Sequence, residues 1–146
     1  MATSTIVQLL QAGEAGDTSN RRQIETFIAG GTIAAGDCVG FDTTKTGADR
    51  ALFVTEAGTV AIGNSLAIGV ALNAATADQQ VRCVVAGYAE NVKCGAGVAA
   101  GDPLSVGQAA TGTVDTRVAA DTAQTFGVAL EAVAANTVDI IVFKQF

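Results

Sequence analysis

The sequence predicts an all-β fold, a small barrel or sandwich built from two similar halves. Three observations lead to this prediction. Blocks of sequence recur in the same order along the chain, 17 glycines and a single proline provide turns throughout, and the apolar stretches have strand length without a long amphipathic helix among them. Glycine reaches positive φ without a Cβ clash, so it suits the many tight connections that short strands need.

The repeated blocks define the two halves. Their offsets are 65, 58 and 57 positions, so the second half keeps the order of the first and has a shorter middle. Two copies at this spacing are too few for a solenoid, and we expect one domain over residues 24–146 with halves of about 28–92 and 93–146. The paired blocks are Ile33–Asp37 with Val98–Asp102, Ile68–Ala74 with Phe126–Ala132, and Val81–Val85 with Val138–Val142.

Residues 1–23 differ from the rest and are expected to form an extended N-terminal arm. An apolar patch of Ile6, Val7, Leu9 and Leu10 is followed by the polar, glycine-rich stretch 11–20. The patch is too short to fold alone, so it packs on the domain, packs on a partner or stays disordered. A short helix beginning after Ser4 is an alternative for the same stretch.

Strand periodicity begins at Ile24, where residues alternate with period two until Gly30 and Gly31 end the run. Further apolar stretches bounded by turn residues predict the remaining strands. They are Cys38–Phe41, Ala51–Thr55, Leu66–Leu72, Gln80–Ala86, Tyr88–Val92, Leu104–Val106, Thr116–Val118, Thr125–Leu130 and Thr137–Lys144.

The repeated Gly-Asp pairs, Gly36-Asp37 and Gly101-Asp102, predict turns. The glycine takes positive φ, and the aspartate bonds neighbouring backbone N–H groups before the next strand. The stretches 42–49 and 107–115 are expected to be matching exposed loops. Closing the sheet would protect its edges, and one half can pair with the open edge of its copy about a pseudo-twofold axis.

Charge and cysteine content exclude several classes of function. The net charge is −6 and the only adjacent basic pair is Arg21-Arg22, which argues against direct binding of nucleic acid. Three cysteines without CxxC spacing, in a chain without histidine, indicate buried core thiols and no metal site. The uncharged run 57–77 is long enough to span a bilayer, but glycines divide it and part of it is repeated, so we expect no membrane segment. We expect no signal peptide and synthesis in a cytoplasm.

No catalytic or cofactor-binding residues are predicted. The absence of histidine removes Ser-His-Asp and Cys-His chemistry. An aspartic protease needs an Asp-Thr-Gly loop in each half, whereas the corresponding Asp37 and Asp102 are read as turn residues. The Gly13–Ser19 stretch lacks the Gly-Lys of a phosphate loop. Lys45 and Lys93 are the candidates for a lipoyl- or biotinyl-carrier lysine, but neither has the flanking residues that those carriers use.

The repeat pattern also resembles a known family. The stretches 28–37, 66–72 and 81–87, with the ending 138–146, are similar to tailed-bacteriophage capsid decoration, or cement, proteins over most of residues 24–146. The resemblance implies a non-enzymatic virion protein on the outer surface of the head, a homotrimer that clamps neighbouring subunits of the major capsid protein after expansion. In that setting Ile6, Val7, Leu9 and Leu10 would contact a capsid strand or an adjacent protomer. The alternative is a phage fibre or receptor-binding structural module.

Overall fold

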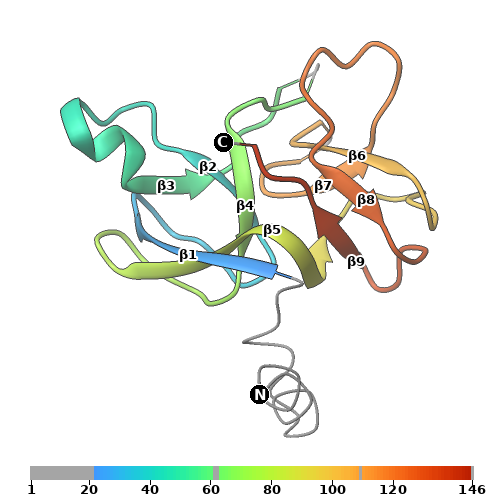
Figure 1. The fold of residues 1–146 in the computed structure, drawn as a ribbon, viewed down its shortest axis with the longest axis horizontal. Helices are drawn as coiled ribbons and strands as arrows, with labels where there is room; N and C mark the ends of the chain where they lie inside the picture. The colour runs from blue at the N-terminus through green and yellow to red at the C-terminus, as the bar shows by residue number, and fades with distance from the viewer. Residues whose placement is uncertain (1–21, 61–62, 109, 146) are drawn as a thin grey trace, which may run out of the picture.

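The structure is a computed structural model that describes residues 22–60, 63–108 and 110–145. The predicted all-β fold is confirmed, and a single 3-10 helix, η1 (Gly47–Ala51), is the helical element among the described residues. Figure 1 shows two β-rich lobes side by side. The strands are β1 (Arg22–Ala29), β2 (Cys38–Phe41), β3 (Phe53–Glu56), β4 (Ala67–Ala71), β5 (Gln80–Lys93), β6 (Pro103–Val106), β7 (Val114–Thr116), β8 (Gly127–Ala129) and β9 (Thr137–Val142).

Each half closes into a five-stranded barrel. The nine strands form one sheet in the order β1-β3-β2-β4-β5-β9-β8-β6-β7, and an additional pairing of β1 with β5 closes the first ring. The second ring runs from β5 through β9, β8 and β6 to β7, and a parallel bridge between Cys94 and Val114 closes it. Closure leaves few unpaired strand edges, which is how small β proteins avoid pairing with other chains.

The two barrels share strand β5. Two strands separated at Gly87 are predicted by the sequence, whereas β5 continues through Gly87, whose φ is 92°. Gly87 pairs with Arg22 of β1 and with Val142 of β9, so β5 passes from the first barrel into the second at this residue. The predicted pairing of two open edges about a pseudo-twofold axis is therefore wrong, because each half closes on itself and β5 belongs to both.

The duplication is visible in matching backbone hydrogen bonds. Several bonds of the first half have counterparts of nearly equal length in the second, at the offsets of the repeated blocks or, for Val54 and Val114, at an offset of 60 positions. The pairs, given as donor N to acceptor O, are Ala71 to Asp37 (2.9 Å) with Ala129 to Asp102 (3.0 Å), Leu72 to Arg82 (2.8 Å) with Leu130 to Asp139 (2.8 Å), and Gly30 to Val54 (2.8 Å) with Gly95 to Val114 (2.9 Å).

The Gly-Asp turns form as predicted. Gly36 has a φ of 85° and Gly101 a φ of 86°, the left-handed region that favours glycine. The Asp37 carboxylate accepts the Ala34 N–H at 2.6 Å, and the Asp102 carboxylate accepts the Ala99 N–H at 3.0 Å. Each aspartate thus satisfies a backbone donor of the turn that precedes its strand.

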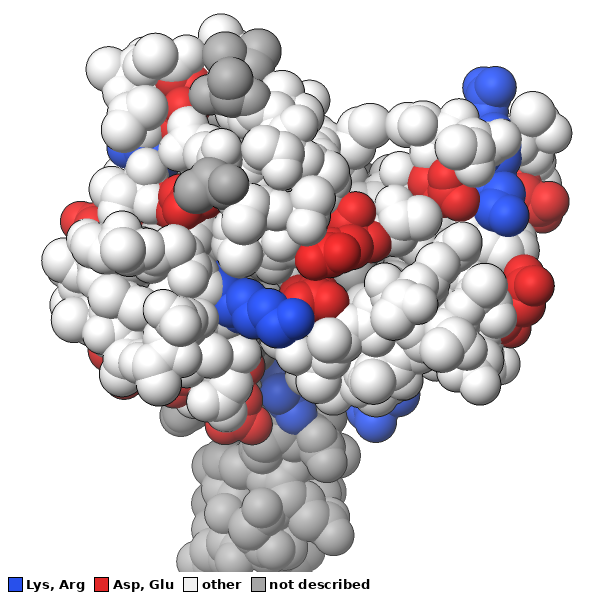
Figure 2. Space-filling view, turned by 180° about the vertical axis from the view of Figure 1, so that it is seen from behind, with Lys and Arg blue, Asp and Glu red and all other residues white. Residues whose placement is uncertain are grey.

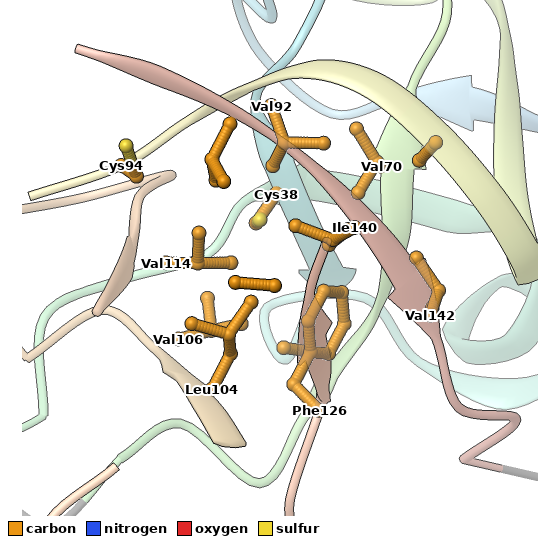
Figure 3. Close-up of a cluster of buried hydrophobic side chains, with 14 of the residues drawn as sticks. Cys38, Val70, Val92, Cys94, Leu104, Val106, Val114, Phe126, Ile140 and Val142 are labelled. Carbon is orange, nitrogen blue, oxygen red and sulfur yellow. The ribbon is translucent and has the colours of Figure 1, made fainter. Parts of the chain in front are cut away.

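Small aliphatic side chains fill both barrels. One cluster lies inside the first barrel around Ile33, Ile68 and Val81, and a larger cluster fills the second barrel and extends to the junction of the halves. In Figure 3 Leu104, Phe126 and Ile140 converge in this larger cluster, with Cys38 beside them. Full burial of one such side chain stabilises a fold by about 1.5–3 kcal/mol, so many small residues replace a few aromatic ones.

The connection between β3 and β4 binds the halves together. The Val60 N–H donates to the Gly107 carbonyl at 2.9 Å, and the Asn64 N–H donates to the Val106 carbonyl at 2.9 Å. The Cys38 N–H of β2 donates to the Gly112 carbonyl at 2.8 Å. These bonds cross from the first half to the second, so the two barrels form one body.

Several boundaries differ from those expected. β1 begins at Arg22, which places the last two residues of the predicted arm in a strand. β7 covers Val114–Thr116 and begins inside the predicted loop 107–115, in place of the expected Thr116–Val118. The loop expected over 42–49 contains the start of η1, and Asp42 is buried there because it holds the turn together. Residues 1–21, and with them Ile6, Val7, Leu9 and Leu10, lie outside the described residues.

Candidate functional site

Asp37 is the most buried charged residue among those described, and it lies where the halves meet. Its side chain forms an ion pair with Lys93 at the end of β5. The Lys93 N–H also donates to the Gly36 carbonyl at 3.0 Å. The Asp37 carboxylate therefore has two partners, the Ala34 N–H of its own turn and the Lys93 ammonium across the junction. The Asp102 carboxylate instead accepts a hydrogen bond from the Thr116 hydroxyl within its own half.

Asp121 organises the connection between β7 and β8. Its buried carboxylate accepts the Ser105 hydroxyl at 3.1 Å, the Gln108 amide and the Val118 N–H at 2.9 Å. The Arg117 guanidinium donates to the Asp121 carbonyl at 2.9 Å. A carboxylate that accepts three hydrogen bonds in a buried position stabilises the loop shape and has little capacity left for a ligand.

Tyr88 and Asp139 form a polar pair across β5 and β9. The Tyr88 hydroxyl donates to Asp139 Oδ2 at 2.7 Å, and the Asn91 N–H donates to Asp139 Oδ1 at 3.0 Å. The hydrogen bond to Asp139, together with burial and the nearby charges of Asp139, Glu90 and Glu131, raises the pKa of Tyr88 to about 12. This pair fixes the irregular pairing between Ala89 and Val92, where Asn91 has a φ of 53°.

The three cysteines are free thiols in the core, as predicted. Burial raises the pKa of Cys83 to about 12, and burial together with the charge of Asp37 and other neighbours raises the pKa of Cys38 far above its usual value. Burial and then Asp115 raise the pKa of Cys94. Thiols of this kind are protonated and unreactive at neutral pH.

The two lysines considered as carrier sites are placed differently. The Lys45 ammonium lies 4.3 Å from the centre of the Phe53 ring, a cation–π contact, and Lys93 is the partner of Asp37. Among residues 22–60, 63–108 and 110–145, no three His, Cys, Asp or Glu side chains are arranged to hold a metal ion. The described part of the chain also has no helix of the length and apolarity that a membrane span requires.

A hollow on the surface at the end of β2 combines apolar and charged groups. It has a volume of about 420 Å³ and is lined by Phe41, Asp42, Thr43, Arg50 and Leu66. Hydrogen bonds from the Thr44 hydroxyl and N–H to Asp42 Oδ1 lower the pKa of Asp42. Sequence reasoning missed this pocket, because its walls come from β2, η1 and the residue before β4, which no local motif connects.

Charged groups are spread thinly over the surface. Figure 2 shows the face opposite to that of Figure 1, where uncharged side chains predominate, charged ones form small separate groups, and the outline is notched between the lobes. Six large apolar side chains among the described residues are 40–52% exposed, namely Leu52, Val60, Leu66, Val118, Leu130 and Phe143. Single exposed apolar residues are ordinary, but six on a small body offer several contact points for partners.

Comparison with solved structures finds a likeness in fold. No protein-family model matches the chain, and no curated protein sequence matches it. Among solved structures, the chain is similar to the N base of the head fiber gp8.5 of bacteriophage phi29, with a TM-score of 0.56 and 19% sequence identity. The similarity covers 85% of this chain and 95% of that one, so the two share the fold over nearly their whole described length.

Proposed function

We propose that the protein is a non-enzymatic structural protein of a phage particle. It binds the outside of the head as a homotrimer and cements neighbouring subunits of the major capsid protein, which stabilises the expanded capsid. The observation that carries this proposal is the fold that the chain shares, over 85% of its length, with the base of a phage head fiber. The repeated blocks that resemble capsid decoration proteins support the same class of role.

The use of the buried charged groups also favours a structural role. The Asp37 carboxylate accepts the Ala34 N–H and forms an ion pair with Lys93, the Asp121 carboxylate accepts three hydrogen bonds, and Asp42 is satisfied by Thr44. Catalytic groups in contrast have side chains that converge on a common cavity and point into it. Here the carboxylates lie in separate places, and each holds backbone or side-chain groups of the protein itself.

The arm is proposed as the main contact with the capsid or with an adjacent protomer. Its patch of Ile6, Val7, Leu9 and Leu10 has the length and apolarity of a strand that adds to a partner sheet. Deleting residues 2–20 is expected to leave a folded protein, with unchanged circular dichroism, that no longer co-sediments with purified heads. A truncated protein that still decorates heads normally would remove the arm from the proposal.

The fiber alternative has an observation of its own, because the structural neighbour is the base of a head fiber. In that role the two barrels would form the foot that attaches a longer appendage or a receptor-binding module to the head. Such a foot also needs a rigid body and exposed apolar contacts, so the shape of the fold is compatible with both roles.

The copy number on purified particles separates the two roles. Quantitative mass spectrometry is expected to find about one copy of this chain for each copy of the major capsid protein, since a cement protein covers the whole head surface. A few tens of copies or fewer would favour the fiber base, and complete absence from particles would overturn both. The heat stability of expanded heads, measured with and without added protein, gives an independent readout.

A further inference from the structure

The pocket at the end of β2 has the composition of a peptide-binding site. Phe41 and Leu66 provide apolar walls, and Arg50 provides a cation at the rim. A volume of about 420 Å³ is within the range of sites that accept several side-chain or ligand groups. Leu66 is 45% exposed, so a partner that covers it would bury apolar surface that water now contacts.

The polar groups around the pocket are already held in place. The Arg50 Nε donates to the Lys45 carbonyl at 3.0 Å, which fixes the guanidinium on η1. The Leu66 N–H donates to the Asn64 side chain at 2.9 Å. A partner would therefore meet a surface whose shape is set before binding, which lowers the entropy cost of association.

The second half shows what covers the equivalent place. The Asp42 N–H donates to the Phe53 carbonyl at 3.0 Å, and the Gly107 N–H donates to the Thr113 carbonyl at 2.9 Å, so Asp42 and Gly107 are counterparts. Phe41 then corresponds to Val106, which is 1% exposed.

Val106 and Gly107 are covered by a peptide segment from the other half. The N–H groups of Val60 and Asn64 donate to their carbonyls, as described above. The sequence from Thr59 to Asn64 is uncharged and mostly small or aliphatic. The duplicated fold thus provides an example of the kind of ligand that this end of a barrel accepts, namely an uncharged apolar peptide segment supplied by the preceding unit.

Residues 1–21 precede the first half, and they contain a segment with this chemistry. The stretch Ile6–Leu10 is uncharged and has four aliphatic side chains out of five. It is followed by Glu14 and Asp17, and no Lys or Arg occurs before Arg21. Arg50 at the rim, with Lys45 nearby, complements these two carboxylates, and the Asp42 carboxylate that also lines the pocket is already held by Thr44.

We propose that the pocket receives the segment Ile6–Leu10 of a second copy of the chain. β1 runs the eight residues from Arg22 to Ala29 before Gly30, whose lack of a Cβ lets the Asp42 carboxylate lie against the backbone. Arg22 is therefore roughly 25 Å from the pocket along an extended strand. Within one chain the segment would have to reverse at Arg22 and return along the whole of β1, a reversal that binding to another copy does not require.

The linker between the segment and β1 sets the reach of this exchange. The residues between Leu10 and Arg22 span at most about 36–40 Å when fully extended. Exchange of the segment between copies would link each protomer to the next. The inference rests on the proposed function, because binding to a head brings copies of the chain together. It identifies another copy of the chain as the binding partner of the arm.

Disulfide trapping tests the contact. The native thiols are buried and unreactive, so the introduced cysteines are the thiols available for oxidation. Leu9→Cys protein carrying an affinity tag is mixed with untagged Leu66→Cys protein and oxidised. The matched control is Leu130→Cys, because Leu130 is 48% exposed and lies in the connection between β8 and β9.

The expected yield of mixed dimer with Leu66→Cys is about tenfold that with Leu130→Cys, since a bound segment raises the local thiol concentration. Equal yields would overturn the inference. The double variant Leu9→Cys/Leu66→Cys provides a second measurement. If it forms an internal disulfide while the mixture yields no dimer above control, the segment occupies the pocket of its own chain, which also overturns the inference.

A second pair of variants separates this inference from the proposed function. Leu66→Glu and Leu130→Glu both alter exposed side chains, so both are expected to fold. Sedimentation velocity is expected to show weaker self-association for Leu66→Glu alone. Failed trapping together with normal head binding by the unmodified protein would remove only the exchange. Successful trapping together with no head binding would refute only the proposed function.

Discussion

Replacing Gly69 by alanine tests how closely the backbone of β4 packs against that of β5. A Cβ at Gly69 would lie 2.5 Å from the Val84 carbonyl oxygen, whereas ordinary contact begins near 3.4 Å, so the strands must separate by roughly 0.9 Å. β4 pairs with β2 on one side and β5 on the other, which leaves little freedom to move. The corresponding Cβ at Gly127 would approach the Ile141 carbonyl oxygen even more closely.

The size of the effect follows from two opposing terms. Overpacking of a closed site costs about 1–3 kcal/mol. Replacing a glycine by alanine restricts the unfolded chain, which raises the free energy of unfolding by about 0.4–1 kcal/mol. We therefore expect Gly69→Ala to lower the free energy of unfolding by about 1–2 kcal/mol, which for a chain of this size lowers Tm by about 2–8 °C.

Urea unfolding followed by circular dichroism measures this change, with Gly31→Ala as the control. A Cβ at Gly31 would have no atom within 4 Å and its φ is not positive, so this variant should be as stable as the unmodified protein or slightly more so. Gly127→Ala should destabilise at least as much as Gly69→Ala. If Gly69→Ala and Gly127→Ala unfold at the same urea concentration as Gly31→Ala, the close backbone approach in both halves is refuted.

Three further predictions concern titratable and buried groups. The chain has a single tyrosine and no tryptophan, so ultraviolet titration reports Tyr88 alone; its pKa should be about 12 and should fall toward 10 in Asp139→Asn. Because the folded pKa is raised above the unfolded value, the stabilisation from this group is present below pH 10 and is lost as the pH rises from about 10 to 12, which urea unfolding across that range would detect. The three thiols should react with a disulfide reagent only at the rate of unfolding, and rapid reaction in native protein would contradict their burial. Asp121→Ala should lower the free energy of unfolding by about 1–3 kcal/mol, because it leaves Ser105 and Gln108 without their acceptor; Asp115→Ala, at a less buried carboxylate, is the comparison.

The parts of the fold that depend on local chemistry could be predicted from the sequence. Gly36-Asp37 and Gly101-Asp102 form turns because glycine and aspartate carry the needed φ and acceptor within the turn itself. The all-β class and the equivalence of the halves followed from the repeated blocks, which keep the same apolar positions.

The parts of the fold that depend on closure of the barrels could not be predicted from the sequence. Gly87 looks like a strand break in sequence, yet partners on both sides keep β5 continuous there. Asp42 looks like an exposed loop residue, but hydrogen bonds from Thr44 and packing against Gly30 bury it. The pocket beside it combines side chains from three elements, so only the closed barrel brings Phe41, Arg50 and Leu66 together.

The strand that both barrels share makes the architecture extendable in whole units. β9 has the same position in the second barrel as the first part of β5 has in the first, with matching bonds to the neighbouring strand. A tandem copy of residues 86–142 joined after Val142 would continue β9 as β5 continues, and would close a third barrel on its own core. Duplication of a gene segment can therefore lengthen such a protein in fixed steps while every earlier core stays intact.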